Sequence, residues 1–60
     1  MIDVSALSAT ERAKHYRKLA ADARQEAELA LPTVRQSYVI IAEQWEGLAV
    51  AAEAEVKRGG

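Results

Sequence analysis

The sequence has no cysteine, a single histidine and no phenylalanine. Without cysteine the chain can form neither a disulfide framework nor a thiolate zinc site, and one histidine excludes a histidine-rich metal cluster within one chain. Eight basic and nine acidic residues give a net charge of −1, so the bulk charge does not point to nucleic acid. Sixty residues make one small domain, with a core too small for an enclosed catalytic cleft. We therefore expect a protein that is not an enzyme and binds no cofactor.

Long hydrophobic runs are also missing. The longest uninterrupted apolar runs cover residues 38–42 and 48–52, far short of the about 20 residues needed to cross a bilayer. Residues 1–5 show neither the positive charge nor the apolar stretch of a signal peptide. These features predict a cytoplasmic protein that does not enter a membrane.

Only one proline and three glycines interrupt the chain, and they divide it into two long segments. In the first segment, Ser8 and Glu11 have the spacing of a capping box, in which each side chain satisfies a free backbone N–H group; Ser5 is an alternative cap. Alanine, arginine, lysine, glutamate and glutamine then predominate, and all are strong helix formers. We predict a helix over about residues 8–30, preceded by a flexible arm at 1–7.

The second segment begins near Pro32. Proline is favoured as the first residue of a helix, whereas residues 33–36 form a second capping-box pattern, so two starting points remain open. Two basic residues and a glycine close to the end of the chain suit a helix C-terminus. We predict a helix over about residues 33–57, followed by a flexible tail at 58–60.

Apolar residues recur at alternating intervals of three and four along both segments, which is typical of a coiled-coil seam. The predicted seam residues are Ala9, Ala13, Tyr16, Ala20, Ala23, Ala27 and Ala30 in the first helix, and Val34, Tyr38, Ile41, Trp45, Leu48 and Ala52 in the second. The short connection must fold the helices back on each other. The sequence therefore predicts an all-α fold, an antiparallel helical hairpin in which large side chains of the second helix pack on alanines of the first.

The charge distribution favours the same arrangement. Residues 8–24 carry five basic and two acidic residues, a balance of +3, whereas residues 25–56 carry one basic and six acidic residues, a balance of −5. Antiparallel folding brings the basic start of the first helix beside the acidic end of the second, and Glu26 and Glu28 near Arg35. Exposed ion pairs stabilise a fold little, so these charges select orientation more than they stabilise.

The second helix carries more apolar surface than one seam uses. Large exposed apolar patches usually mark interfaces, and a two-helix hairpin with an alanine-rich seam is poorly stable by itself. Pairing two hairpins into a four-helix bundle solves both problems. We therefore expect a homodimer that acts as a protein–protein interaction module, with a leftover face for another protein. The predicted interface residues are Leu19, Val39, Ile40, Gly47, Val50 and Ala51.

A basic cluster in the first helix supports an alternative function, that of a small nucleic-acid-associated regulator. Its residues are Arg12, Lys14, Arg17, Lys18 and Arg24. No nucleic-acid recognition motif accompanies them, and the acidic second helix is expected beside them. A solvated face with ion pairs inside the chain is therefore the simpler interpretation.

Two pairs of residues have a spacing that could hold a metal ion. Glu11 and His15 are one helical turn apart, but they supply only two ligands. Glu43 and Glu46 could meet their copies in a dimer, but the Glu-x-x-His motif of bundle metal sites is missing. We expect neither pair to bind a metal.

Residues of both helices form a pattern that extends over about positions 12–54. It consists of His15-Tyr16-Arg17-Lys18-Leu19-Ala20, Ala23-Arg24, Ala27, Pro32, Arg35, Tyr38 and Ile41-Ala42-Glu43-Gln44-Trp45-Glu46-Gly47-Leu48-Ala49. This pattern resembles a group of short helical-hairpin proteins from alphaproteobacteria that have no known activity. The resemblance implies a hairpin fold and a bacterial cytoplasmic setting, and it carries over no functional residues. Leu31 departs from the group, in which Asp or a similar cap often precedes the proline.

Overall fold

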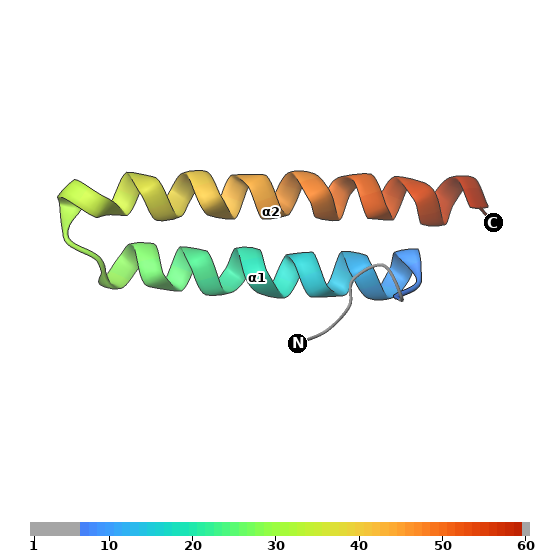
Figure 1. Cartoon of the computed structure of the whole chain (residues 1–60), viewed down its shortest axis with the longest axis horizontal. Helices are drawn as coiled ribbons and strands as arrows, with labels where there is room; N and C mark the ends of the chain where they lie inside the picture. The colour runs from blue at the N-terminus through green and yellow to red at the C-terminus, as the bar shows by residue number, and fades with distance from the viewer. Residues whose placement is uncertain (1–6, 60) are drawn as a thin grey trace.

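The chain folds into two long antiparallel helices joined by a short connection (Figure 1). The computed structural model describes residues 7–59. Helix α1 spans Ala9–Leu29 and helix α2 spans Pro32–Gly59. The prediction of an all-α helical hairpin is therefore confirmed.

Helix α2 extends to Gly59, two residues beyond its predicted end. The predicted tail thus begins inside the helix, and its last residue, Gly60, lies outside the described residues. Of the predicted N-terminal arm, residues 1–6 likewise lie outside the described residues, and Leu7 is half-buried. Lys57 and Arg58 occupy the last turn of α2, where the partial negative charge of the helix terminus favours cations.

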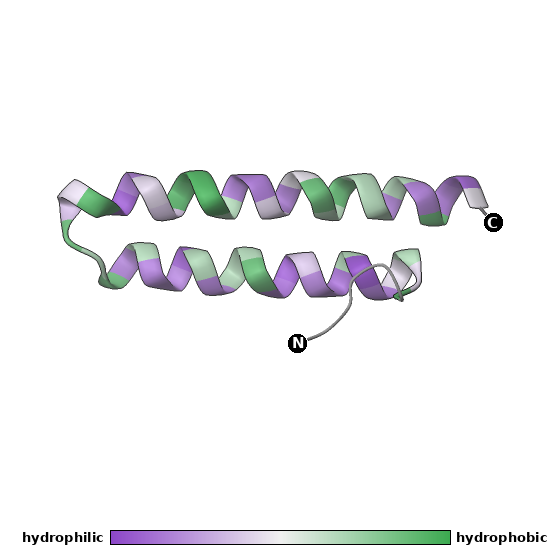
Figure 2. Cartoon of the chain, in the orientation of Figure 1, coloured by the Kyte–Doolittle hydropathy of each residue, from purple (hydrophilic) through white to green (hydrophobic). Residues whose placement is uncertain are grey.

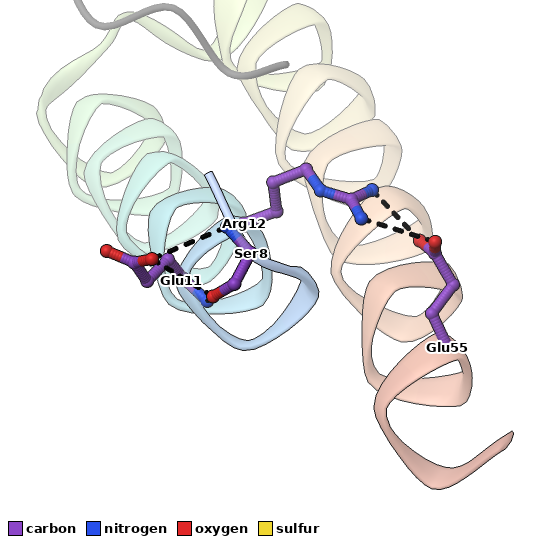
Figure 3. Close-up of polar contacts among 4 residues, drawn as sticks. All are labelled: Ser8, Glu11, Arg12 and Glu55. Carbon is purple, nitrogen blue, oxygen red and sulfur yellow. Dashed lines mark hydrogen bonds and ion pairs between the residues drawn. The ribbon is translucent and has the colours of Figure 1, made fainter. Parts of the chain in front are cut away.

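Helix α1 begins at the predicted capping box. The Ser8 hydroxyl accepts a hydrogen bond from the backbone N–H of Glu11 at 3.2 Å, and the Glu11 carboxylate accepts one from the backbone N–H of Ser8 at 3.4 Å (Figure 3). Two N–H groups that have no partner within the helix are satisfied in this way, so the helix starts at Ala9. The alternative cap, Ser5, lies outside the described residues.

Helix α2 begins at Pro32, which decides between the two predicted starting points. Proline suits this position because its φ angle is already helical and it has no N–H to satisfy. The carbonyl of Leu31 accepts hydrogen bonds from the backbone N–H groups of Val34 and Arg35, at 2.9 and 3.0 Å. Leu31 therefore takes the cap position without a side-chain oxygen, and the pattern at residues 33–36 falls inside the first turn.

Arg35, in the first turn of α2, reaches back across the connection to cap the C-terminal end of α1. Its Nε donates to the carbonyl of Ala27 at 3.1 Å and its Nη2 donates to the carbonyl of Ala30 at 3.3 Å. Helix α1 has no basic residue in its last turn, so Arg35 supplies the cation that satisfies its C-terminal carbonyls. Among the described residues Arg35 forms no ion pair with Glu26 or Glu28, although Glu28 lines the same groove as Arg35, as the predicted nearness requires.

The buried seam between the helices consists entirely of alanines. They are Ala13, Ala20, Ala23 and Ala27 from α1, and Ala42, Ala49 and Ala52 from α2. Tyr16, Tyr38 and Trp45 are half-buried beside them. The rings of Tyr16 and Trp45 stack across the two helices, with centroids 5.9 Å apart. The α1 side of the predicted seam is therefore confirmed at its four central alanines.

The predicted α2 side is wrong at Val34, Ile41 and Leu48, whose exposures are 45, 41 and 46%. Ala42 and Ala49, at 0% exposure, face α1 in their place. Positions 38, 42, 45, 49 and 52 have the same alternating spacing, so the sequence pattern fits either set. Helix α2 is rotated about its axis toward the alanines because small side chains on both helices allow the backbones to approach closely.

The hairpin is a single layer of helices, with extents of 43 × 23 × 12 Å. The thickness is that of one helix with its side chains, about 10–12 Å. Folded domains normally enclose their core between two packed layers. Among the described residues no large side chain is fully buried, so this layer has two open broad faces. Helix α2 is visibly richer in hydrophobic segments than α1 (Figure 2).

Candidate protein-interaction surface

One broad face of the hairpin is charged. Arg17 pairs with Glu53 at 2.8 Å, and Arg24 pairs with Glu46 at 2.7 Å, each through two hydrogen bonds between guanidinium and carboxylate. Arg17 and Arg24 are seven residues apart and so lie on the same side of α1. We call these four residues the charged face.

Arg12 forms a third ion pair across the two helices, with Glu55 at 2.9 Å (Figure 3). It is five residues from Arg17 and therefore lies about 140° further round α1, toward the opposite broad face. Arg12 and Arg17, in the first half of α1, pair with residues near the end of α2, and Arg24, further along α1, pairs with Glu46 near the middle of α2. The antiparallel arrangement expected from the charge distribution is thus present, with ion pairs on both sides of the seam.

These pairs hold the carboxylates in their charged form. Hydrogen bonds from Arg24, Arg17 and Arg12 lower the pKa values of Glu46, Glu53 and Glu55 below the usual value for glutamate. The pKa values of the three arginines are raised by the same hydrogen bonds.

The hairpin should therefore be less stable in acid. A carboxylate whose pKa is lower in the folded state adds stability above its unfolded-state pKa and loses it as the pH falls through the folded-state pKa. We expect the melting temperature, measured by circular dichroism at fixed concentration, to be lower at pH 3 than at pH 7. Salt at 1 M screens exposed charges, so it should shrink this difference. An equal or higher melting temperature at pH 3 in low salt would show that these ion pairs do not stabilise the hairpin.

The same pairs occupy most of the basic cluster considered for nucleic acid. Arg12, Arg17 and Arg24 are in ion pairs with α2, and Lys18 pairs with Asp22 within α1 at 3.1 Å. Lys14 is exposed and lines a groove of about 660 Å³ between the open ends of the helices, together with Arg17, Glu53 and Lys57. The structure thus divides the cluster between both broad faces, so it does not form one continuous basic stripe.

The predicted interface residues do not gather into one surface. Ile40 and Gly47 are exposed on the edge of α2 that points away from α1, and Ala51, three residues from Leu48, is exposed between this edge and the second broad face. Val39 is half-buried and lines a second groove with Arg24, Glu28 and Arg35. Of the other two residues, Val50 is 56% exposed on α2, and Leu19 is half-buried on α1.

Gly47 has open space where a side chain would begin: no atom lies within 4 Å of a Cβ placed there. Gly47→Ala should therefore stabilise the protein by about 1 kcal/mol, since glycine is a poor residue for a helix interior. Thermal unfolding with unchanged sedimentation would show this effect. Loss of assembly in the alanine variant would instead place Gly47 inside an interface.

Three large apolar residues share the second broad face. Ile41 and Leu48 lie seven residues apart on one side of α2, with exposures of 41 and 46%, and Val34 continues the row toward the connection at 45%. Leu19 lies on the corresponding side of α1, opposite in direction to the charged face. We call these four residues the apolar face. Three of them, Val34, Ile41 and Leu48, were predicted to lie in the seam, because spacing alone does not show which row of α2 faces α1.

The candidate metal ligands are separated or engaged elsewhere. Glu11 is part of the capping box, and Glu46 is paired with Arg24. Over residues 7–59, no three side chains of the metal-binding types come together. Neither of the two described helices is both long and apolar enough to cross a bilayer.

Comparison of the chain with protein-family models, with curated proteins and with solved structures gave no match. The case for a function therefore depends on the surfaces of the hairpin.

Proposed function

We propose that the protein is a non-enzymatic protein–protein interaction module that self-associates, two hairpins pairing through their apolar faces into a four-helix bundle. One observation carries this proposal. The described residues that are buried are all alanines, while the large residues Ile41 and Leu48 keep more than 40% of their surface in water. A second hairpin on this face would supply the missing layer of the fold.

The area available agrees with this role. The extents of 43 × 23 Å give each broad face a projected area of roughly 990 Å², and a standard protein interface takes about 800 Å² from each partner. The charged face is a poorer candidate, because its guanidinium and carboxylate groups would lose water on contact without gaining new partners. A bacterial cytoplasmic location is proposed on the resemblance alone.

Sedimentation equilibrium of the full chain at micromolar concentration tests the proposal. The expected mass is twice the 6.5 kDa of one chain, with a melting temperature that rises with protein concentration. A helical species that stays at the mass of one chain up to the highest concentration would overturn it.

A further inference from the structure

We infer that the second copy is reversed: the two hairpins pair about a two-fold axis perpendicular to their helices, so that α1 lies antiparallel to α1, α2 antiparallel to α2, and the connections lie at opposite ends. This inference rests on the proposed self-association and adds its geometry. It is argued from two rows of residues that border the apolar face, one on each helix.

The row on α2 is self-complementary when it is reversed. Its exposed members are Val34, Ser37, Ile41, Gln44, Leu48 and Ala51, at the alternating spacing of a coiled-coil seam. Reversal about Gln44 brings Ile41 to within one residue of the height of Leu48 of the other copy, and sets Ser37 level with Ala51. Large residues then meet large ones near the centre, small residues meet small ones further out, and Gln44 meets its own copy on the axis. A polar residue at such a position fixes the register of a helix pair.

The row on α1 is self-complementary in charge. Arg12 and His15 lie on the N-terminal side of Leu19, and Asp22 and Glu26 lie on its C-terminal side. Reversal near Leu19 sets Glu26 of one copy level with Arg12 of the other, whose guanidinium already pairs with Glu55 of its own chain. The ion pair between Lys18 and Asp22 spans this point at 3.1 Å, so the reversed copy would place an oppositely directed pair alongside it.

The centres of the two rows, Leu19 on α1 and Gln44 on α2, lie at nearly the same height along the hairpin. The Tyr16–Trp45 stack holds the two helices together near their midpoints, with ring centroids 5.9 Å apart. Leu19 and Gln44 are three residues and one residue from these rings in sequence. A single axis can therefore pass through the centre of both rows.

The other two-fold arrangement has its axis parallel to the helices and sets α1 against α2 of the second copy. It would set Asp22 opposite the part of α2 around Ile40, and Glu26 opposite the part around Gln36. The nearest basic residue of α2 is Arg35, whose guanidinium already donates to the carbonyls of Ala27 and Ala30 in its own chain, so neither carboxylate would face a cation on the apolar face. The reversed arrangement sets Glu26 beside the Arg12–Glu55 pair of the other copy, where Arg12 can share its guanidinium with both carboxylates, and charge complementarity therefore favours it.

Cysteine substitution tests the geometry without interference, because the chain has no cysteine of its own. Gln44→Cys is expected to link most of the protein into a covalent dimer under mild oxidation, since Gln44 faces itself across the axis. Glu43→Cys is the matched control. Glu43 is also exposed, but it lies about 100° round the helix from Gln44, which puts the two Glu43 Cα atoms beyond the roughly 7 Å limit for a disulfide.

A spin label at Leu31→Cys gives an independent distance. Leu31 is 73% exposed at the connection, away from the apolar face. In the reversed dimer two labels should be about 39 Å apart, because 26 helical steps of about 1.5 Å separate the two positions in height. With both connections at one end they would lie within roughly 20 Å, about two helix diameters.

Sedimentation of the reduced variants separates the two possible failures. If the unsubstituted protein sediments as a monomer, the proposed self-association itself is overturned. A dimer with labels close together would overturn the reversed geometry and leave self-association standing. If Gln44→Cys weakens the dimer, the label distance at Leu31 decides the geometry alone.

Discussion

Leu48→Glu is expected to turn the dimer into a folded monomer. Leu48 is 46% exposed on the apolar face, and in a four-helix bundle its remaining surface would be buried against the second copy. Completing the burial of a leucine contributes on the order of 1.4 kcal/mol, and the change is made twice in a dimer. The dissociation constant should therefore rise at least about 100-fold. Sedimentation across a concentration series measures this shift.

Val50→Glu is the matched control for that experiment. Val50 lies two residues further along α2, is 56% exposed and points away from the apolar face. The same charge introduced there should leave the dissociation constant nearly unchanged. If Val50→Glu separated the copies and Leu48→Glu did not, the interface would instead include Val50, as predicted from the sequence. Far-ultraviolet circular dichroism distinguishes a folded monomer from an unfolded chain in either case.

Ala42→Leu is expected to destabilise the hairpin itself. Ala42 is completely buried between the helices, and a leucine at that position must force them apart. Overpacking of this kind costs about 1–3 kcal/mol, which corresponds to a fall of roughly 10 °C in the melting temperature of so small a domain. Thermal unfolding followed by circular dichroism at fixed protein concentration gives the comparison.

Ala54→Leu controls for the effect of leucine in α2. Ala54 is exposed in the same helix, and leucine is nearly as good a helix former as alanine, so its melting temperature should stay close to that of the parent. A stable Ala42→Leu protein would mean that the seam has room for large side chains. Helix α2 could then turn Ile41 and Leu48 toward α1, and no apolar face would remain for a second copy.

The two helices could be predicted because their signals are local. The Ser8 capping box, the helix-forming composition and the proline near position 32 act through neighbouring residues, so periodicity and capping rules locate the helices closely. The cap that Arg35 provides for α1 was missed, since it joins residues on both sides of the connection. The absence of a basic residue or glycine at the end of α1 was the available signal.

The rotation of α2 could not be predicted from spacing. The row containing Ile41 and Leu48 and the row containing Ala42 and Ala49 both follow intervals of three and four. Assigning the larger residues to the seam maximises their burial within one chain. The structure instead buries alanine against alanine and leaves the large residues outside. This choice is what creates the candidate interaction surface.

The sequence by itself determined an all-α hairpin, the antiparallel orientation of its two helices and the capping box at the start of α1. These features depend on helix propensity, capping and opposite charges, which act within short stretches or between whole helices. Only the tertiary structure decided which side of α2 faces α1. That choice depends on how closely two backbones approach, and the approach depends on all the seam residues together. Since the side left outside carries Ile41 and Leu48, the proposed function follows from this packing rather than from any motif.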